Sequence, residues 1–209
     1  MLLMKPEKER TETDMNNPVN TAPRQKDPTL VITGKDTLFS YCNLAEPKSV
    51  NGGTPRFGMS AVVSKDDQAT VKALRDGQRA AYEKYKDKLK NKNGSIPPME
   101  SIKLAIRDGD LDRPDDPVYA NCVFVNANSE SRPKLFDVNG NAVMDSSEIY
   151  SGCYGKAAVS FFVFNTNGNR GIGCHLHAVQ KIRDGEPLGG MNVTIADFMG
   201  TDDDEDLLG

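Results

Sequence analysis

Two histidines stand two residues apart, at His175 and His177, and no other spacing in the chain is closer to that of an enzyme. On an extended strand, residues i and i+2 point to the same side of the sheet, so both imidazoles could share one metal ion. Val179 stands where a third histidine would continue the alternation, and the chain contains 2 His in all. A metal- or nucleotide-dependent hydrolase centred on His175 and His177 is therefore an alternative, but we favour two exposed side chains on a strand.

The stretch from Asp137 to Glu148 carries oxygen-bearing side chains at the spacing of a calcium loop. Asp or Asn occupies its first, third and fifth positions, and acids occupy the ninth and twelfth. The sixth position is Ala142, where the sharp turn of such a loop needs glycine. The dipeptide Asn139-Gly140 is typical of a tight hairpin turn instead. We therefore expect a β-hairpin here and no calcium.

The four cysteines are far apart in the sequence and form no C-x-x-C pair. In a chain without a secretion signal, such cysteines are typical of buried thiols. We expect neither a disulfide framework nor a zinc site, and the sequence predicts no cofactor. The cysteines are Cys42, Cys122, Cys153 and Cys174.

Aromatic and basic side chains recur along the predicted strands, and this combination can bind single-stranded DNA. Binding a single strand without sequence preference needs cations along the phosphates and rings that stack on the bases. Phe162 and Phe164 share a strand face with Lys156, whereas the opposite face of that strand is aliphatic. The candidate DNA contacts are Lys35, Tyr41, Lys48, Arg56, Phe57, Tyr119, Tyr150, Tyr154, Lys156, Phe162, Phe164, Arg170 and Lys181.

Acidic residues are concentrated at the C-terminus. Six acids and no Lys or Arg lie between Asp197 and Gly209, which leaves 24 acids against 26 basic residues over residues 1–196. A mildly basic body thus carries a strongly acidic tail. A polyanionic tail can occupy a DNA groove when DNA is absent and dock on basic partner proteins once it is displaced. Its candidate partner-binding residues are Phe198, Asp202, Asp203, Asp204, Glu205 and Asp206.

Hydrophobic periodicity predicts a mainly β domain with one long helix. Strands are expected over residues 29–41, 56–63, 119–126, 150–165 and 170–182, with a loop over residues 46–55. Ser64 is the expected N-cap of the helix, which should end near Asn93-Gly94. Its expected apolar face at helical spacing is Val71, Leu74, Ala81, Tyr82, Tyr85 and Leu89. In the last strand, Leu176 and Cys174 are expected on one face, and Val179 on the other with both histidines.

These elements suit a small Greek-key barrel of the OB-fold type with one long helix. We expect an OB-fold DNA-binding domain over residues 29–190 and an acidic tail over residues 191–209. Residues 1–28 are polar, contain 4 prolines and lack aromatic residues, so we expect this segment to be disordered. No apolar run approaches the length of a membrane span and no signal peptide is recognisable, which favours the cytoplasm and no membrane partner.

A series of short motifs covers about residues 29–190. They are Val31–Lys35, Glu46–Lys48, Asn51–Gly53, Arg107–Asp110, Arg113–Asp116, Tyr119–Asn121, Val125–Asn128, Tyr150–Gly155, Phe164–Asn165, Asn167–Asn169 and Gln180–Gly190. In these motifs the chain resembles a family of phage replicative single-stranded DNA-binding proteins.

The resemblance implies an OB-fold, a role in phage DNA replication or recombination in the bacterial host cytoplasm, and no catalytic residues. It also implies an acidic tail that contacts replication or recombination proteins. Related phage proteins often place an aromatic residue at the extreme C-terminus, whereas this chain ends Leu207-Leu208-Gly209. An RNA-binding or scaffold module is the second alternative. A homodimer is compatible with the sequence, which fixes no oligomeric state.

Overall fold

The computed structural model describes residues 27–49, 52–166 and 169–189, and the acidic tail and residues 1–26 lie outside these ranges. The described residues form β1 (Leu30–Ile32), β2 (Thr37–Lys48), β3 (Arg56–Ser64), β4 (Ile106–Asp108), β5 (Cys122–Ser129), β6 (Lys134–Phe136), β7 (Tyr154–Thr166) and β8 (Asn169–Arg183). The helices are α1 (Gln68–Tyr85) and the short α2 (Gly109–Asp112). Single 3-10 turns span Lys86–Leu89, Met99–Ser101, Pro117–Tyr119 and Ser146–Glu148.

Five strands close into a ring. Neighbouring strands pair in the order β7, β2, β3, β5 and β8, and β8 pairs in turn with β7. All of these pairs are antiparallel except β5 with β8, which is parallel. β1 and β6 extend the sheet beside β7 and β8, and β4 pairs with β5. The ring confirms the predicted small Greek-key barrel of the OB type.

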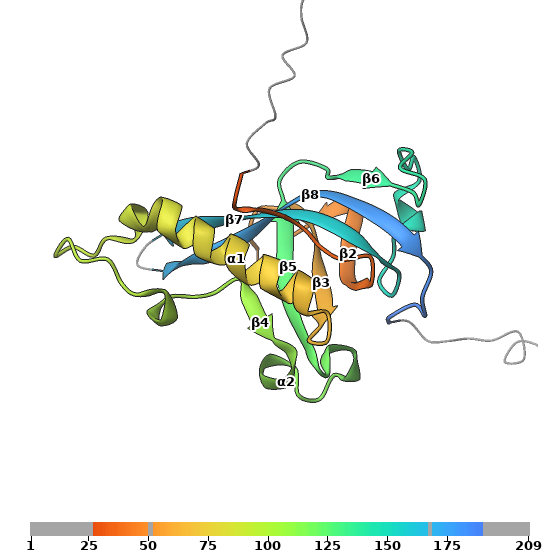
Figure 1. The fold of residues 1–209 in the computed structure, drawn as a ribbon. Helices are drawn as coiled ribbons and strands as arrows, with labels where there is room; N and C mark the ends of the chain where they lie inside the picture. Colours follow the sequence, from red (N-terminus) through yellow and green to blue (C-terminus); the bar gives the residue numbers. More distant parts are fainter. Residues whose placement is uncertain (1–26, 50–51, 167–168, 190–209) are drawn as a thin grey trace, which may run out of the picture.

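The interior of the barrel is filled by one face of each long strand. Along β7, Ala157, Val159 and Phe161 are at most 2% exposed. Phe162, the residue after Phe161, points outward. Figure 1 shows α1 lying along one side of the barrel, where it packs on β1, β3 and β7. Its buried residues Val71, Leu74 and Ala81 are those expected from helical spacing. The predicted core faces of α1 and β7 are therefore confirmed.

The N-cap of α1 differs from the prediction. Ser64 is the last residue of β3, and Asp67 is the N-cap, whose carboxylate accepts a hydrogen bond from the Thr70 N–H at 3.0 Å. Hydrogen bonding by the Thr70 side chain, and then by the Thr70 N–H, lowers the pKa of Asp67, since both stabilise the charged carboxylate. The helix ends at Tyr85 and continues as a 3-10 turn, so it is shorter than the sequence suggests.

A β-bulge in β8 changes which face its residues occupy. Ala158 pairs with Ala178 but Val159 pairs with Leu176, so His177 is an extra residue on β8. An extra residue reverses the alternation beyond it. Val179 is consequently fully buried, and its predicted place beside the histidines on the outer face is wrong.

Other strand boundaries also differ from expectation. A turn divides the predicted strand over residues 29–41 into β1 and β2. β2 then extends into the first part of the expected loop and ends at Lys48. The Asn139-Gly140 turn is confirmed, with Gly140 at a φ of 85° and Asp137 accepting a hydrogen bond from the Asn141 N–H at 2.8 Å. All four cysteines are free thiols; Cys153 and Cys174 are buried, as expected, whereas Cys42 and Cys122 are half-buried. No helix in the described part of the chain is long and apolar enough to cross a membrane.

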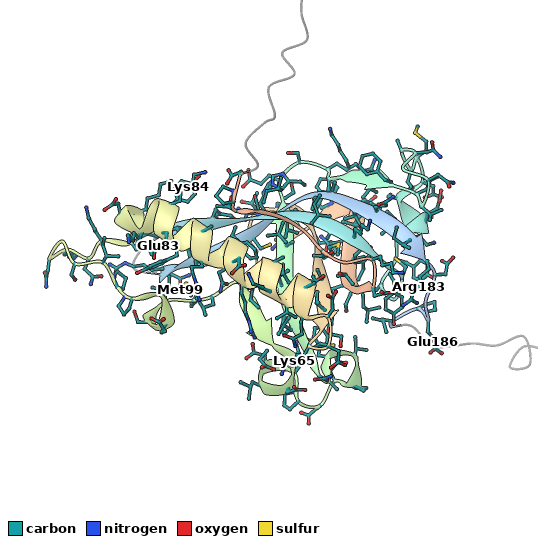
Figure 2. The ribbon with its side chains drawn as sticks, in the orientation of Figure 1. Lys65, Glu83, Lys84, Met99, Arg183 and Glu186 are labelled. Carbon is teal, nitrogen blue, oxygen red and sulfur yellow. The ribbon has the colours of Figure 1, made fainter. Side chains whose placement is uncertain are left out.

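The ends of α1 are tied to different parts of the molecule. At its N-terminal end, the Lys65 ammonium lies 2.7 Å from Asp108 and 2.6 Å from Asp110, which joins the β3–α1 turn to α2 (Figure 2). Glu83 and Lys84 lie at the other end of the helix (Figure 2). There, the segment after α1 returns along the tip of the β7–β8 hairpin, and Lys103 bridges to Gly171.

Gly77, near the middle of α1, lets the helix pack closely on the barrel. A Cβ at this position would lie 2.6 Å from Cγ2 of Val31 and 3.1 Å from the Phe161 ring. Glycine weakens an isolated helix, but here it lets α1 approach β1 and β7 closely.

We predict that Gly77→Leu lowers the free energy of unfolding by about 1–3 kcal/mol because it overpacks this contact. Chemical denaturation measures the change. Arg75→Leu, at an exposed position of the same helix, is the matched control and should be nearly neutral. Leucine favours a helix by about 0.8 kcal/mol over glycine, so a stabilised Gly77→Leu variant would contradict the close contact.

Candidate nucleic-acid interface

Two adjoining cavities lie on the outer side of the barrel. Their volumes are about 850 and 1000 Å³, and both are lined by Arg56, Asn126 and Asn128. The first extends to Phe162 and Phe164 on β7, and the second to Tyr41 on β2. Together they cross β2, β3, β5, β8 and β7, and we call the two cavities the groove.

Phe162 and Phe164 form a flat aromatic surface at one end of the groove. Each ring stands opposite a glycine on β8, since Phe162 pairs with Gly173 and Phe164 with Gly171. A Cβ would lie 2.5 Å from the Phe162 ring at Gly173 and 2.9 Å from the Phe164 ring at Gly171. The glycines therefore let the rings lie across the β8 backbone, which is a known use of glycine in strands. Phe162 is still 41% exposed, so a base can stack on it.

Tyr41 forms the other end of the groove. It lies where the β2–β3 register shifts, and its φ of 49° is rare for a side chain of this size. This irregularity turns the ring outward, so that 59% of Tyr41 is exposed. The Arg113 guanidinium lies 5.2 Å from the ring centroid and donates a hydrogen bond to the Tyr41 hydroxyl at 2.9 Å. Arg113 thus fixes the ring and adds positive charge beside it.

Arg56 lies at the junction of the two cavities. Its guanidinium is 3.0 Å from the Glu130 carboxylate, and both side chains are largely exposed. An exposed ion pair contributes little free energy, so a phosphate can replace Glu130 at small cost. Lys48 and Arg113 also line the groove. The groove therefore combines two sets of rings with three cations.

The two histidines belong to the same surface. His175 lines the groove, and His177 Nε2 lies 2.7 Å from the Ser160 hydroxyl oxygen. Burial, together with the neighbouring His175, lowers the pKa of His177, which favours the neutral form of this ring. Among the residues that the structure describes, no third His, Cys, Asp or Glu joins the pair to form a metal-binding cluster.

The family model described as "Enterobacter phage Enc34, ssDNA-binding protein" matches residues 29–208 of this chain. The chain belongs to this family.

A curated phage protein and a solved structure are similar to most of this chain. Protein p50 of Acyrthosiphon pisum secondary endosymbiont phage 1 is 27% identical over 176 residues, which cover 81% of this chain and 94% of p50. A solved structure of the single-stranded DNA-binding protein from bacteriophage Enc34, in complex with single-stranded DNA, matches with a TM-score of 0.67 at 23% identity and covers 77% of this chain and 90% of that one.

A more distant structure shares the fold. The single-stranded DNA-binding protein gp2.5 of bacteriophage T7 matches with a TM-score of 0.54 at 16% identity, over 75% of this chain and 93% of gp2.5. At these identities the solved structures establish the fold alone. The descriptions of the family and of these structures name DNA binding and no catalysed reaction.

The structure brings together only some of the residues predicted from the sequence. Tyr41, Lys48, Arg56, Phe162 and Phe164 line the groove. The other predicted contacts are absent from its described lining. These are Lys35, Phe57, Tyr119, Tyr150, Tyr154, Lys156, Arg170 and Lys181.

Several of these residues already have partners elsewhere. Arg183 covers the Tyr154 ring at 3.5 Å, and the Tyr150 hydroxyl donates a hydrogen bond to Asp184 at 2.9 Å. Lys181 forms an ion pair with Asp184 at 2.6 Å, and Arg170 forms a hydrogen bond with Asn91. Figure 2 shows Arg183 at the opposite side of the molecule from Glu83 and Lys84.

Strand parity accounts for the exclusion of Phe57, and position along the strand accounts for that of Lys156. Phe57 is half-buried, has the strand parity of the buried Met59 and Ala61, and does not line the groove. Lys156 is exposed on the outer face of β7 but stands opposite Gln180, six residues along the strand from Phe162.

Sequence reasoning missed several residues of the groove, among them Asn126, Asn128 and Arg113. Asn126 and Asn128 alternate along β5 with buried Val125 and Ala127, and this alternation is visible in the sequence. Arg113 lies in a turn-rich acidic segment, where no sequence signal relates it to Tyr41 on β2.

Tyr119 is a core residue and cannot stack on a base, which corrects its prediction as a DNA contact. It is 1% exposed, and its ring meets Phe124 edge to face at 4.9 Å. Arg113 lies 5.2 Å above the same ring, so Tyr119 supports the guanidinium that holds Tyr41. Within the described residues its buried hydroxyl has no hydrogen-bond partner.

We predict that Tyr119→Phe raises the free energy of unfolding by about 1 kcal/mol, because it removes an unsatisfied buried hydroxyl and keeps the ring. Tyr119→Ala should lower it by about 3–5 kcal/mol. Both are measured by chemical denaturation. A destabilised Tyr119→Phe variant would show that the hydroxyl has a partner and refute the assignment.

Proposed function

We propose that this protein binds single-stranded DNA in the groove, with little dependence on base sequence, during phage DNA replication or recombination in the host cytoplasm. Bases stack on the rings at the two ends, and phosphates lie against Lys48, Arg56 and Arg113. The observation that carries the proposal is the exposed Phe162 ring, held flat over Gly173 in a cavity that Arg56 also lines. A core ring is sealed from solvent, whereas this one is presented to it.

The chemistry of the groove suits a single strand better than a duplex. Stacking requires an unpaired base, and each base on an aromatic ring contributes about 1–3 kcal/mol. Asn and Ser side chains line the floor between the rings, and because they both donate and accept hydrogen bonds, they can bond to the edge of any base. Family membership and the fold shared with DNA-binding phage proteins support the same assignment.

The acidic tail is part of the proposal. Residues 29–190 form the DNA-binding domain, and Phe198 with the acids from Asp202 to Asp206 contacts basic replication or recombination proteins. These tail residues lie outside the described ranges, so their role is inferred from charge alone. The tail occupies the groove when DNA is absent, and it docks on the basic surface of a partner protein when DNA displaces it.

We predict that affinity for a labelled oligonucleotide falls with salt, with a slope of about −0.7 per phosphate contacted. Arg56→Ala should make that slope shallower by about 0.7, because it removes one phosphate contact. Phe162→Ala should weaken binding by about 1–3 kcal/mol at every salt concentration and keep the slope, because it removes a ring and no charge. Fluorescence anisotropy measures both quantities.

The contrast between these two variants is the control for each. Unfolding curves of Phe162→Ala should match those of the wild type, since the ring is at the surface. Loss of the fold in this variant, or a wild-type affinity that salt does not change, would reject the proposed binding mode. An RNA oligonucleotide of the same sequence tests the RNA-binding alternative.

We predict that deleting residues 197–209 strengthens DNA binding on the order of tenfold at low salt, because a competing polyanion is removed. The gain should shrink as salt screens the tail. A full-length variant with Asn or Gln at the acids from Asp202 to Asp206 separates charge from length. Unchanged affinity in both would show that the tail does not compete for the groove.

A further inference from the structure

We infer that the groove is a bipartite site, with two stacking stations that one DNA strand must bridge. The inference rests on the proposed function and adds a geometric requirement. Station A is Tyr41 with Arg113, and station B is Phe162 with Phe164.

The stations lie at opposite ends of the groove. From Tyr41 to Phe162 the sheet passes from β2 through β3, β5 and β8 to β7. Four strand-to-strand steps of about 4.8 Å place the two rings roughly 19 Å apart along the sheet. The path is nearly perpendicular to the strands, since Ser40, next to Tyr41, pairs with Ser60, and Ser60 pairs with Asn126.

The floor between the stations has a different chemistry. Asn126 and Asn128 project from β5, and among the described residues neither side-chain amide forms a hydrogen bond with another part of the chain. Asn128 lies over Gly58, where a Cβ would be 2.4 Å from its carbonyl oxygen. Apart from His175, beside station B, no described lining residue in this middle part is aromatic. Bases in the middle therefore meet amides and Arg56, and stacking on protein rings is confined to the ends.

Each station is built to hold its ring in place. Arg113 is fixed on Tyr41 by the hydroxyl hydrogen bond and rests on the buried Tyr119 ring. Phe162 lies on the glycine backbone of β8. Two fixed stations act as linked binding modules, so the second contact is intramolecular once the first has formed.

The separation sets a minimum length for the DNA. A stacked strand rises about 3.4 Å per nucleotide, so a trinucleotide spans roughly 7 Å, or roughly 14 Å at twice that rise. Neither distance reaches both rings. A strand of twelve nucleotides does, and bridging should raise affinity by on the order of 100-fold or more over one station.

The test compares oligo(dT) of three and of twelve nucleotides, by competition against a labelled strand, with full-length protein. In wild-type protein the ratio of the two affinities should be about 100-fold or more. Tyr41→Ala and Phe162→Ala should each reduce that ratio by about tenfold, because either change leaves one station and the bridge is lost. Tyr154→Ala removes a half-buried ring outside the groove and should leave the ratio unchanged.

The outcomes are distinguishable. If a ring variant weakens both oligonucleotides by the same factor, the rings act independently and the bipartite site is wrong, although the proposed function stands. If wild-type protein binds neither oligonucleotide, the proposed function itself fails. Tyr41→Leu, with unfolding curves, replaces Tyr41→Ala if that variant does not fold, and the same change in ratio is expected. Loss of the fold in Phe162→Ala would instead reject the proposed binding mode and the bipartite site with it.

Discussion

The pairing of β7 with three neighbours is the constraint on which the rest of the structure depends. β7 pairs with β2 and β8 to close the ring, and with β1 to extend it. These registers place Phe161 in the core and Phe162 outside it. Because side chains alternate, a shift of one residue would exchange the two rings. The same alternation that fills the barrel therefore also presents the aromatic surface of the groove.

The groove depends on local departures from regular strand structure. Gly171 and Gly173 have no side chain, which leaves room for the phenylalanine rings. An irregularity in β2 turns Tyr41 outward at a positive φ. Such features weaken a strand or strain its backbone, and they persist when the surrounding structure holds them. Here the ring of strands and the contact of Tyr41 with Arg113 hold them, which gives the rings fixed positions before any ligand arrives.

Fewer than half of the Lys and Arg side chains in the described part of the chain form ion pairs. Lys65 with Asp108 and Lys181 with Asp184 are ion pairs away from the groove, and Arg56 with Glu130 is an exposed pair inside it. The cations in the described lining of the groove are few, namely Lys48, Arg56 and Arg113, and residues 1–196 carry a small positive excess of 26 basic over 24 acidic residues. In the proposed binding mode, stacking then supplies much of the binding free energy, and a tail with five adjacent acids competes electrostatically for so modest a positive surface.

The sequence by itself determined the mainly β domain, the core faces of α1 and β7, and the outward position of Phe162, because these follow from local periodicity. The sequence also indicated Tyr41, Lys48 and Arg56 as candidate DNA contacts, and all three line the groove. It could not exclude Tyr119, Tyr154 or Lys181, since a ring or a cation has the same local pattern whether its partner is a core residue, an acid or solvent. Only the tertiary structure placed Arg113 on Tyr41 and a bulge at His177, because both depend on register between segments that are distant in the chain.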